Sequence, residues 1–370
     1  MESVSKSATN SLQLLKKNYP HLKFKCADPE DLALDEKFDY VIANYIHDTE
    51  DIQTSLDRMR AHCTEQSRLL IINYNQLWEP ILEVASAVGL RAPCIEPNWV
   101  SVQDVCGFLR LSGFRHIRTH HILLCPKYVP LISSFLNGFV AKVPGLNRLS
   151  LIRVIVARVE PSERPQQETS VSVIVPCRNE RGNIQAAVER IPVMGKHTEI
   201  IFCDDRSTDG TSDEVRRMQA LYPYKEIRLV DGPGICKAEN VWTGFHRAKG
   251  DVLMILDADL TVMPEELPFF FRALVEGRGE FINGSRLVYP IPKMAMKFAN
   301  RLGNKVFGIV FSYLLSQRLK DTLCGTKVLW RKDWLRIEKG LGTWGIRELW
   351  GDYELILGAS KLHLEITEVR

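Results

Sequence analysis

Short apolar runs alternate with longer amphipathic stretches through the first part of the chain. FDYVIAN, RLLIINYN, HIRTHHILL and LIRVIVARV predict strands, and LKFKCAD predicts a further short one. Residues 51–63 and 102–112 predict helices, and the second ends at Gly113, a residue suited to the left-handed cap of a helix. This alternation predicts an α/β fold whose sheet is mostly parallel, with an antiparallel edge near its end.

The same alternation is tighter in the second part of the chain. VSVIVP, EIIFCDD, EIRLV, DVLMILDAD and GEFINGSR predict strands, and residues 184–190, 213–221, 238–248 and 265–276 predict helices. Between the two parts, VEPSERPQQETS is rich in Pro, Ser and Gln and poor in apolar residues, which is typical of a linker. We therefore expect two domains, 1–159 and 171–370, joined by a linker at 160–170.

Acidic residues follow several of the predicted strands in the second domain. Glu180 comes after the first strand, Asp204 and Asp205 after the second, and Asp257 and Asp259 after a later one. Open α/β sheets bind ligands outside the carboxyl ends of their strands, where clustered carboxylates would repel one another unless a cation lay between them. Mg²⁺ or Mn²⁺ is held by one or two carboxylates plus substrate phosphates, and residues i and i+2 of an extended segment point the same way. An isolated pair of this kind is more often a loop with solvated acids, but the matching strand ends favour a metal site.

Five segments carry a resemblance to a known family. VIVPCRNERGNI, CDDRSTDGT, ILDADL, INGSR and DTLCGTKVLWRKDW, in that order, resemble the motifs of family 2 glycosyltransferases with the GT-A fold, a Rossmann-like nucleotide-diphospho-sugar transferase fold. The subgroup that they resemble most is the dolichyl-phosphate mannose synthase and polyprenyl-phosphate glycosyltransferase type. The resemblance covers residues 171–370 and implies inverting transfer of a hexosyl group from a UDP- or GDP-sugar, with Mg²⁺ or Mn²⁺ as cofactor.

The resemblance also implies roles for individual residues. It places Pro176, Arg178 and Glu180 in the nucleotide pocket, although Arg178 stands where the family usually has an aromatic residue. It implies that Asp205 accepts from the base. Asp257 and Asp259 would hold the metal and the diphosphate, and Ala258 between them would contact the nucleotide sugar. Arg286 would support the diphosphate or the acceptor.

The acceptor is left open between a polyprenyl phosphate and a cell-surface glycan precursor. A sugar hydroxyl would need a general base, for which Asp352 is the candidate and Glu354 the lesser one, whereas for a lipid phosphate Asp352 would only position groups. Residues 293–320 are apolar with basic residues at intervals, so they either lie at a membrane interface or form a core helix pair closing the acceptor side. We accordingly expect a cytoplasmic protein, with peripheral contact to the cytoplasmic membrane face.

The first domain resembles the later strands of a class I S-adenosylmethionine methyltransferase. The resemblance rests on LKFKCADPEDL, KFDYVIANYIHDTED and RLLIINYN, and it implies that Asp28 lies near the adenine. The glycine-rich first strand and helix of that family are absent, so we expect an incomplete sheet with an exposed edge, which would bind S-adenosylmethionine only in a complete domain. His47, His120 and His121 are interpreted as structural. In the glycosyltransferase family the chain continues beyond the last strand, which leaves open whether Arg370 is a natural end.

Composition and charge argue against some classes of protein and leave the interpretations above unchanged. The 370 residues carry a formal net charge of +3, with no basic run typical of a nucleic-acid tail, and no apolar run of membrane-spanning length. Nine cysteines without a CxxC pair indicate a reducing compartment, and the N-terminus has no apolar signal core. Two alternatives remain: a methyltransferase with an accessory nucleotide-sugar-binding or nucleotidyltransferase domain, and a scaffold that binds nucleotide without turnover.

Overall fold

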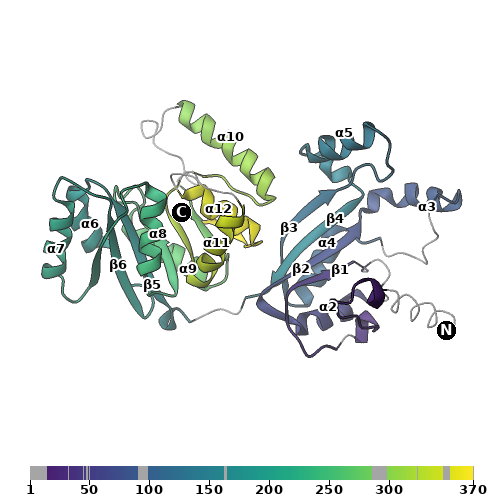
Figure 1. The fold of residues 1–370 in the computed structure, drawn as a ribbon, viewed down its shortest axis with the longest axis horizontal. Helices are drawn as coiled ribbons and strands as arrows, with labels where there is room; N and C mark the ends of the chain where they lie inside the picture. Colours follow the sequence, from purple (N-terminus) through teal and green to yellow (C-terminus); the bar gives the residue numbers. More distant parts are fainter. Residues whose placement is uncertain are drawn as a thin grey trace. The chain divides into compact units, whose positions relative to one another are not determined.

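The computed structural model describes residues 15–369 except 32, 45, 47, 48, 50, 91–98, 162–164, 286–297, 323 and 345–350, and it describes only the backbone of 298–305. The chain divides into two compact units, Met1–Glu160 and Pro161–Arg370, each of which is described by itself (Figure 1). Both combine a sheet with helices, so the predicted α/β fold class is confirmed.

The first unit contains a four-stranded sheet in the order β1-β2-β4-β3. Its strands are β1 (Phe38–Ala43), β2 (Cys63–Tyr74), β3 (Phe114–Ile122) and β4 (Ile152–Val159). Strands β1 and β2 are parallel, whereas β4 is antiparallel to both β2 and β3. The prediction of a mostly parallel sheet is therefore wrong for this unit, and its antiparallel strand is internal rather than at the edge. The strand predicted in LKFKCAD is also wrong, because residues 23–28 pair with no strand of this sheet.

Helices and 3-10 helices accompany this sheet in the described part of the first unit. They are α2 (Ile52–Ala61), α3 (Glu79–Ala87), α4 (Val102–Leu111) and α5 (Ile132–Gly138), with η1 (Pro29–Asp31), η3 (Gln76–Trp78), η4 (Val140–Lys142) and η5 (Leu146–Leu149). Helices α2 and α4 cover one face of the sheet, where Leu56 and Leu109 pack against Leu69 and Ile155. Gly113 adopts a φ of 69° after α4, as the left-handed cap predicted there requires.

The second unit contains a seven-stranded sheet in the order β11-β9-β10-β8-β5-β6-β7, in which only β10 is antiparallel to its neighbours. The strands are β5 (Ser170–Cys177), β6 (His197–Asp204), β7 (Glu226–Asp231), β8 (Val252–Ile255), β9 (Phe281–Gly284), β10 (Lys327–Trp330) and β11 (Ile366–Val369). The described helices are α6 (Arg181–Arg190), α7 (Thr211–Leu221), α8 (Lys237–Arg247), α9 (Leu267–Val275), α10 (Phe298–Leu315), α11 (Arg331–Trp344) and α12 (Asp352–Lys361), with η6 (Gln166–Glu168) and η7 (Pro264–Glu266).

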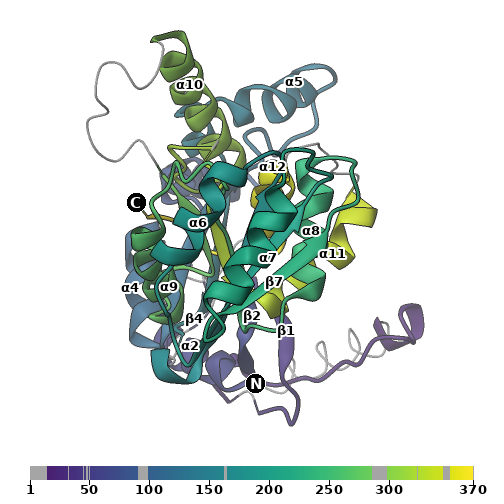
Figure 2. The ribbon, with the colours of Figure 1, turned by 90° about the vertical axis from the view of Figure 1, so that its left-hand side faces the viewer.

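Helices cover both faces of this sheet, and alternate strand residues belong to different cores. Val173 and Val175 of β5 pack with α6, α7 and α9, whereas Ile174 packs with α8, α11 and α12. Figure 2 shows α6 and α9 on one side of the sheet and α8 and α11 on the other. Burial on both faces explains why these strands are continuous apolar runs.

A buried polar cluster holds the amino ends of the central strands. The Glu199 carboxylate accepts hydrogen bonds from Ser172 Oγ (2.5 Å) and from the backbone N–H of Lys249 (2.6 Å). Arg228 Nη1 donates to its second oxygen at 3.1 Å. The carboxyl ends of the same strands carry the acidic residues, so structural and candidate functional carboxylates lie at opposite ends of the sheet.

Candidate active site

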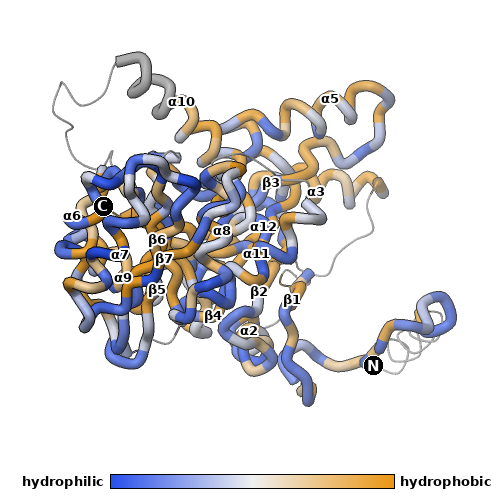
Figure 3. Tube along the Cα trace, turned by 60° about the vertical axis from the view of Figure 1, so that its left-hand side comes forward, coloured by the Kyte–Doolittle hydropathy of each residue, from blue (hydrophilic) through white to orange (hydrophobic). Residues whose placement is uncertain are grey.

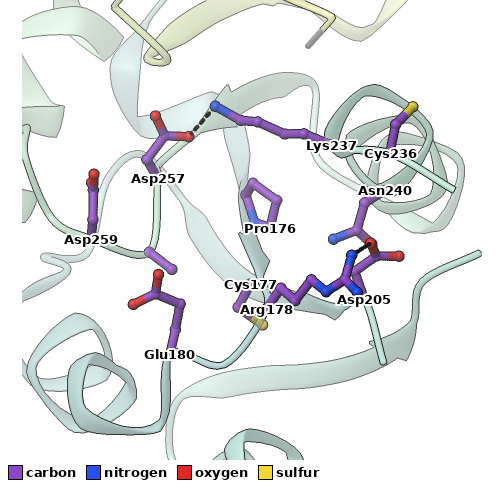
Figure 4. Close-up of a pocket in the computed structure, with 11 residues that line it drawn as sticks. Pro176, Cys177, Arg178, Glu180, Asp205, Cys236, Lys237, Asn240, Asp257 and Asp259 are labelled. Carbon is purple, nitrogen blue, oxygen red and sulfur yellow. Dashed lines mark ion pairs between the residues drawn. The ribbon is translucent and has the colours of Figure 1, made fainter. Parts of the chain in front are cut away.

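A cleft of about 320 Å³ lies at the carboxyl ends of β5, β6 and β8 (Figure 4). It is lined by the residues Pro176, Cys177, Arg178, Glu180, Asp205, Cys236, Lys237, Asn240, Asp257, Ala258 and Asp259. In Figure 4, Asp257, Asp259 and Glu180 lie on one side of Pro176, and Arg178 and Asp205 lie on the other. The cleft therefore has an acidic side and a side where a guanidinium faces a carboxylate.

Asp257 and Asp259 reach the cleft from a turn. Strand β8 ends at Ile255, and the backbone N–H of Leu260 then donates to the carbonyl of Asp257 at 3.0 Å. Leu260 has a φ of 54°, and Asp259 Oδ1 accepts from the backbone N–H of Thr261 at 3.0 Å. The predicted reason for their common direction, extended-strand alternation, is therefore wrong. The turn brings both carboxylates to the cleft instead.

Lys237, the first residue of α8, is the cation of the acidic side. Its Nζ lies 2.7 Å from Asp257 Oδ1, and both side chains are less than one third exposed. Burial would lower the pKa of the Lys237 ammonium, but neighbouring carboxylates, Asp257 first and then Asp352, raise it in net. The ammonium consequently keeps its charge beside the two aspartates.

Asp352 belongs to a second ion pair behind the cleft. It is the first residue of α12, and its Oδ1 lies 3.2 Å from Nζ of Lys327, a fully buried side chain on β10. Glu354, the lesser candidate base, is buried in α12. Neither carboxylate is among the residues that line the cleft.

Gly325 makes room for the Asp257 carboxylate. A Cβ at Gly325 would lie 2.6 Å from Asp257 Cγ and 2.8 Å from Oδ1, where ordinary contact begins at 3.4 Å. Only glycine at this position leaves the carboxylate where it stands.

On the other side of the cleft, Asp205 is fixed by the backbone. Its Oδ1 accepts from the N–H of Gly234 at 2.6 Å, and its Oδ2 lies 3.8 Å from Nη1 of the largely exposed Arg178. Asp204, its neighbour, instead accepts from the N–H of Ser207 (3.0 Å) outside the lining of the cleft. Of these two aspartates, it is therefore Asp205 that a ligand in the cleft can contact.

Glu180 comes directly before α6, and hydrogen bonds hold both its side chain and its backbone in place. Its Oε2 accepts from Asn183 Nδ2 at 2.7 Å, and its backbone N–H donates to Thr211 Oγ1 at 3.0 Å. Asn179 before it adopts a φ of 57°, a conformation that asparagine tolerates better than most residues. These contacts orient the chain between β5 and α6 around the cleft.

The structure brings together seven residues predicted from the sequence: Pro176, Arg178, Glu180, Asp205, Asp257, Ala258 and Asp259. Arg286 lies outside the described residues, as does His47. The prediction missed Cys177, Cys236, Lys237 and Asn240. The available signal was that β7 also ends at this edge of the sheet and leads directly into α8.

Asp28 lies in the first unit, where its Oδ1 accepts from the backbone N–H of Glu30 at 3.0 Å. Asp28 therefore caps the amino end of the short helix η1, which starts at the next residue. Burial, followed by the Arg118 guanidinium, lowers the pKa of His120 to about 4, so this imidazole is neutral near pH 7. Burial also lowers the pKa of His121.

The acidic side of the cleft fits a divalent cation. Within the part of the chain that the structure describes, no group of three or more His, Cys, Asp or Glu side chains could hold a metal ion. Asp257 and Asp259 offer two carboxylates, which is the protein contribution usual for Mg²⁺ or Mn²⁺ bound together with substrate phosphates.

Comparison with known proteins finds similarities over this region. Residues 172–335 match the family model described as Glycosyl transferase family 2. The chain is 38% identical over 120 residues to a dolichol-phosphate mannosyltransferase of Pyrococcus furiosus, covering 32% of this chain and 33% of the relative. It is 39% identical over 109 residues to the Saccharomyces cerevisiae protein of the same name, covering 28% and 40%.

A third relative is the undecaprenyl-phosphate 4-deoxy-4-formamido-L-arabinose transferase of Aeromonas hydrophila, at 32% identity over 111 residues, covering 29% of this chain and 34% of the relative. The chain thus spans between 33% and 40% of the length of these curated relatives. A solved mannosyl-3-phosphoglycerate synthase from Rubrobacter xylanophilus is similar at 17% identity and a TM-score of 0.40, covering 54% of this chain and 65% of that one.

Proposed function

We propose that the second unit is a metal-dependent, inverting glycosyltransferase that moves a hexosyl group from a nucleoside-diphosphate sugar to a phosphate acceptor. The observation that carries the proposal is the convergence of Asp257, Asp259, Glu180 and Asp205 with Lys237 on one cleft at the strand ends. The family match over residues 172–335 supports it. Carboxylates this close to one another favour a ligand that brings a cation and a diphosphate.

In this proposal, different residues of the cleft bind different parts of the donor. Asp205 and Glu180 accept hydrogen bonds from the base and the ribose, and Arg178 lies beside Asp205 at the nucleotide. Asp257 and Asp259 would hold Mg²⁺ or Mn²⁺, which stabilises the charge that grows on the departing diphosphate. Lys237 adds a fixed positive charge next to Asp257.

The ion pair of Asp352 favours a positioning role for this residue over a general base. Its Oδ1 lies 3.2 Å from the fully buried Lys327 ammonium, so this oxygen is already engaged by a fixed positive charge. A lipid phosphate is already an anion and needs no base. The names of the Pyrococcus furiosus and Aeromonas hydrophila relatives support a polyprenyl phosphate over a glycan acceptor.

Helix α10 is the candidate for peripheral membrane contact in this unit. Its described side chains Val306, Phe307, Ile309, Val310 and Leu314 are between 45% and 62% exposed. Among the described residues, no helix is long and apolar enough to cross a bilayer. An exposed apolar helix face suits an interface with lipid, where a polyprenyl phosphate acceptor would be found.

We further infer that the first unit is a partial methyltransferase-like sheet. The parallel pair β1–β2 followed by an antiparallel β4 between β2 and β3 supports this interpretation. Calorimetry of the full chain with S-adenosylmethionine should show no binding, and tight binding would instead favour the methyltransferase alternative.

The glycosyltransferase proposal is tested by a donor screen. GDP- and UDP-sugars are offered with Mg²⁺ or Mn²⁺, and release of nucleoside diphosphate is measured with and without a polyprenyl phosphate. We expect one donor to turn over only with metal and acceptor. Asp257→Asn and Asp259→Asn should abolish this turnover, whereas the surface control Asp213→Asn, whose side chain is 83% exposed, should retain it. Unchanged turnover in both site variants would show that the site is misassigned.

A further inference from the structure

A long stretch of the first unit contains no acidic residue. The 55 residues from Val105 to Val159 include no Asp or Glu but eight Lys or Arg. Within this stretch, residues 123–151 connect β3 to β4 and contain α5, η4 and η5. Three exposed basic residues, Lys127, Lys142 and Arg148, lie in this connection.

The connection turns its large apolar side chains outward. Eight of them are between 43% and 86% exposed, and we call them the α5 surface: Tyr128, Leu131, Ile132, Phe135, Phe139, Val143, Leu146 and Leu149. The rings of Phe135 and Phe139 stack with centroids 5.9 Å apart. Figure 3 shows the α5 segment mostly in the hydrophobic colour. Solvent exposure of this many large apolar residues on one short connection marks an interaction surface.

Polar contacts hold the connection together from inside. Ser133, which is buried, donates from Oγ to the carbonyl of Val129 at 2.8 Å. Asn137 bonds Cys125 twice, accepting from its N–H (2.8 Å) and donating to its carbonyl (2.9 Å). The connection thus has polar groups inside and aromatic groups outside. A segment that packs on its own core has the opposite arrangement.

The connection is also fixed to the end of β2. Asn75 Nδ2 donates to the carbonyls of Arg148 (2.8 Å) and Ser150 (2.9 Å), and Trp78 Nε1 donates to that of Leu149 (2.7 Å). The α5 surface is thus presented by a framework anchored to the sheet.

Helix α3, which follows Trp78, exposes Ile81 and Val84, and Val88 directly after the helix is exposed as well. It carries Glu79 and Glu83, so its apolar face is not free of acids. Of these two surfaces of the first unit, it is the α5 surface that combines exposed apolar side chains with positive charge and no carboxylate.

We propose that the α5 surface docks onto an anionic lipid bilayer. Leu131, Phe135 and Phe139 enter the boundary between headgroups and acyl chains, and Lys127 and Arg148 contact lipid phosphates. Aromatic and aliphatic side chains flanked by basic residues are the composition of interfacial membrane anchors, and each basic residue near an anionic surface strengthens binding about fivefold. The absence of carboxylates removes the repulsion that such a surface would otherwise meet. This contact does not depend on the proposed function of the second unit.

The test is sedimentation of the full chain with vesicles of phosphatidylcholine alone or mixed with phosphatidylglycerol. We expect the mixed vesicles to bind at least about tenfold better, since three basic side chains contribute. The triple variant Leu131→Glu, Phe135→Glu, Phe139→Glu should lose at least about tenfold in binding. The matched control Val193→Glu, Leu221→Glu, Tyr224→Glu makes the same charge change at side chains that are 53% to 78% exposed in the second unit, and should bind as the unchanged chain does.

Two further variants keep the proposal refutable. Lys127→Glu with Arg148→Glu leaves the apolar side chains in place, so it should remove the preference for anionic vesicles while thermal unfolding stays unchanged. Phe307→Glu with Val310→Glu alters α10 alone. The proposal is wrong if the chain ignores both vesicles, if the α5 variants bind like the control, or if only the α10 variant releases the protein. A protein partner would then be the remaining occupant of the α5 surface.

Discussion

Replacing Gly325 by alanine perturbs the proposed metal site with one methyl group. Because the new Cβ would lie 2.6 Å from Asp257 Cγ, where contact begins at 3.4 Å, the carboxylate must retreat by about 1 Å. Gly325 does not need a left-handed backbone, so the substitution strains no φ angle. A displacement of about 1 Å at a reacting centre costs about a hundredfold in rate, or about 2.7 kcal/mol of transition-state stabilisation.

The assay is kcat/KM for nucleoside diphosphate release with the donor found by the screen, together with Mn²⁺ binding by calorimetry. We expect Gly325→Ala to lose about a hundredfold in kcat/KM and to bind Mn²⁺ more weakly. The matched control is Gly342→Ala in α11, where an added Cβ meets nothing within 4 Å. That control should keep full activity. If Gly325→Ala stays within about threefold of the unchanged chain, Asp257 does not act from the position described.

Three other substitutions test the second unit and the local structure of the first. Lys237→Met should tighten Mn²⁺ binding, because it removes the ammonium that competes for Asp257, yet lower kcat/KM by about tenfold or more. Glu199 is expected to make stability depend on pH: burial would raise its pKa, but donated hydrogen bonds and a guanidinium lower it in net from 4.5. Its stabilisation is thus present above 4.5 and lost as the pH falls through the lowered value, so Glu199→Gln should melt earlier at pH 7 and show a flatter melting profile in acid. Ser101→Ala removes the side chain that accepts from the Asp104 N–H at 3.1 Å, and amide exchange in α4 should report a loss of about 1 kcal/mol. A melting profile identical to that of the unchanged chain would contradict the prediction for Glu199, and identical exchange rates would contradict the prediction for Ser101.

The strand-end residues were accessible from sequence because parallel strands bring their carboxyl ends to one edge. Asp205 and Asp257 are 52 positions apart, yet periodicity alone predicted that both would follow a buried strand. Lys237 was missed because a cation at a helix N-terminus opposes the helix dipole and is not expected there. Its ion pair with Asp257 offsets that cost, and this partner is visible only in three dimensions.

The wrong predictions have a common cause. The local pattern of apolar and polar residues does not specify which strands pair or in which direction. The run RLLIINYN is equally apolar whether its neighbour is parallel or antiparallel, so the direction of β4 beside β2 could not be predicted. In the same way, LKFKCAD has strand-like alternation, but nothing in the described sheet pairs with residues 23–28. The turn after β8 depends on a positive φ at Leu260, a conformation that leucine rarely adopts and that sequence does not signal.

Charge balance connects these observations to the proposed acceptor. Asp257, Asp259 and Asp352 face two ammonium groups, Lys237 and Lys327. Glu180 also lies on the acidic side of the cleft, so four carboxylates exceed the ammonium groups by two charges. A divalent cation bound there would neutralise that surplus and remove the repulsion that the anionic diphosphate of a donor would otherwise meet. A neutral hydroxyl acceptor would need a general base, and Asp352 is paired with Lys327 and does not line the cleft, whereas a phosphate needs only positive charge nearby. The buried Lys327 on β10, which lies within the motif DTLCGTKVLWRKDW but was given no role from the sequence, is therefore the residue that favours an anionic acceptor in the proposed function.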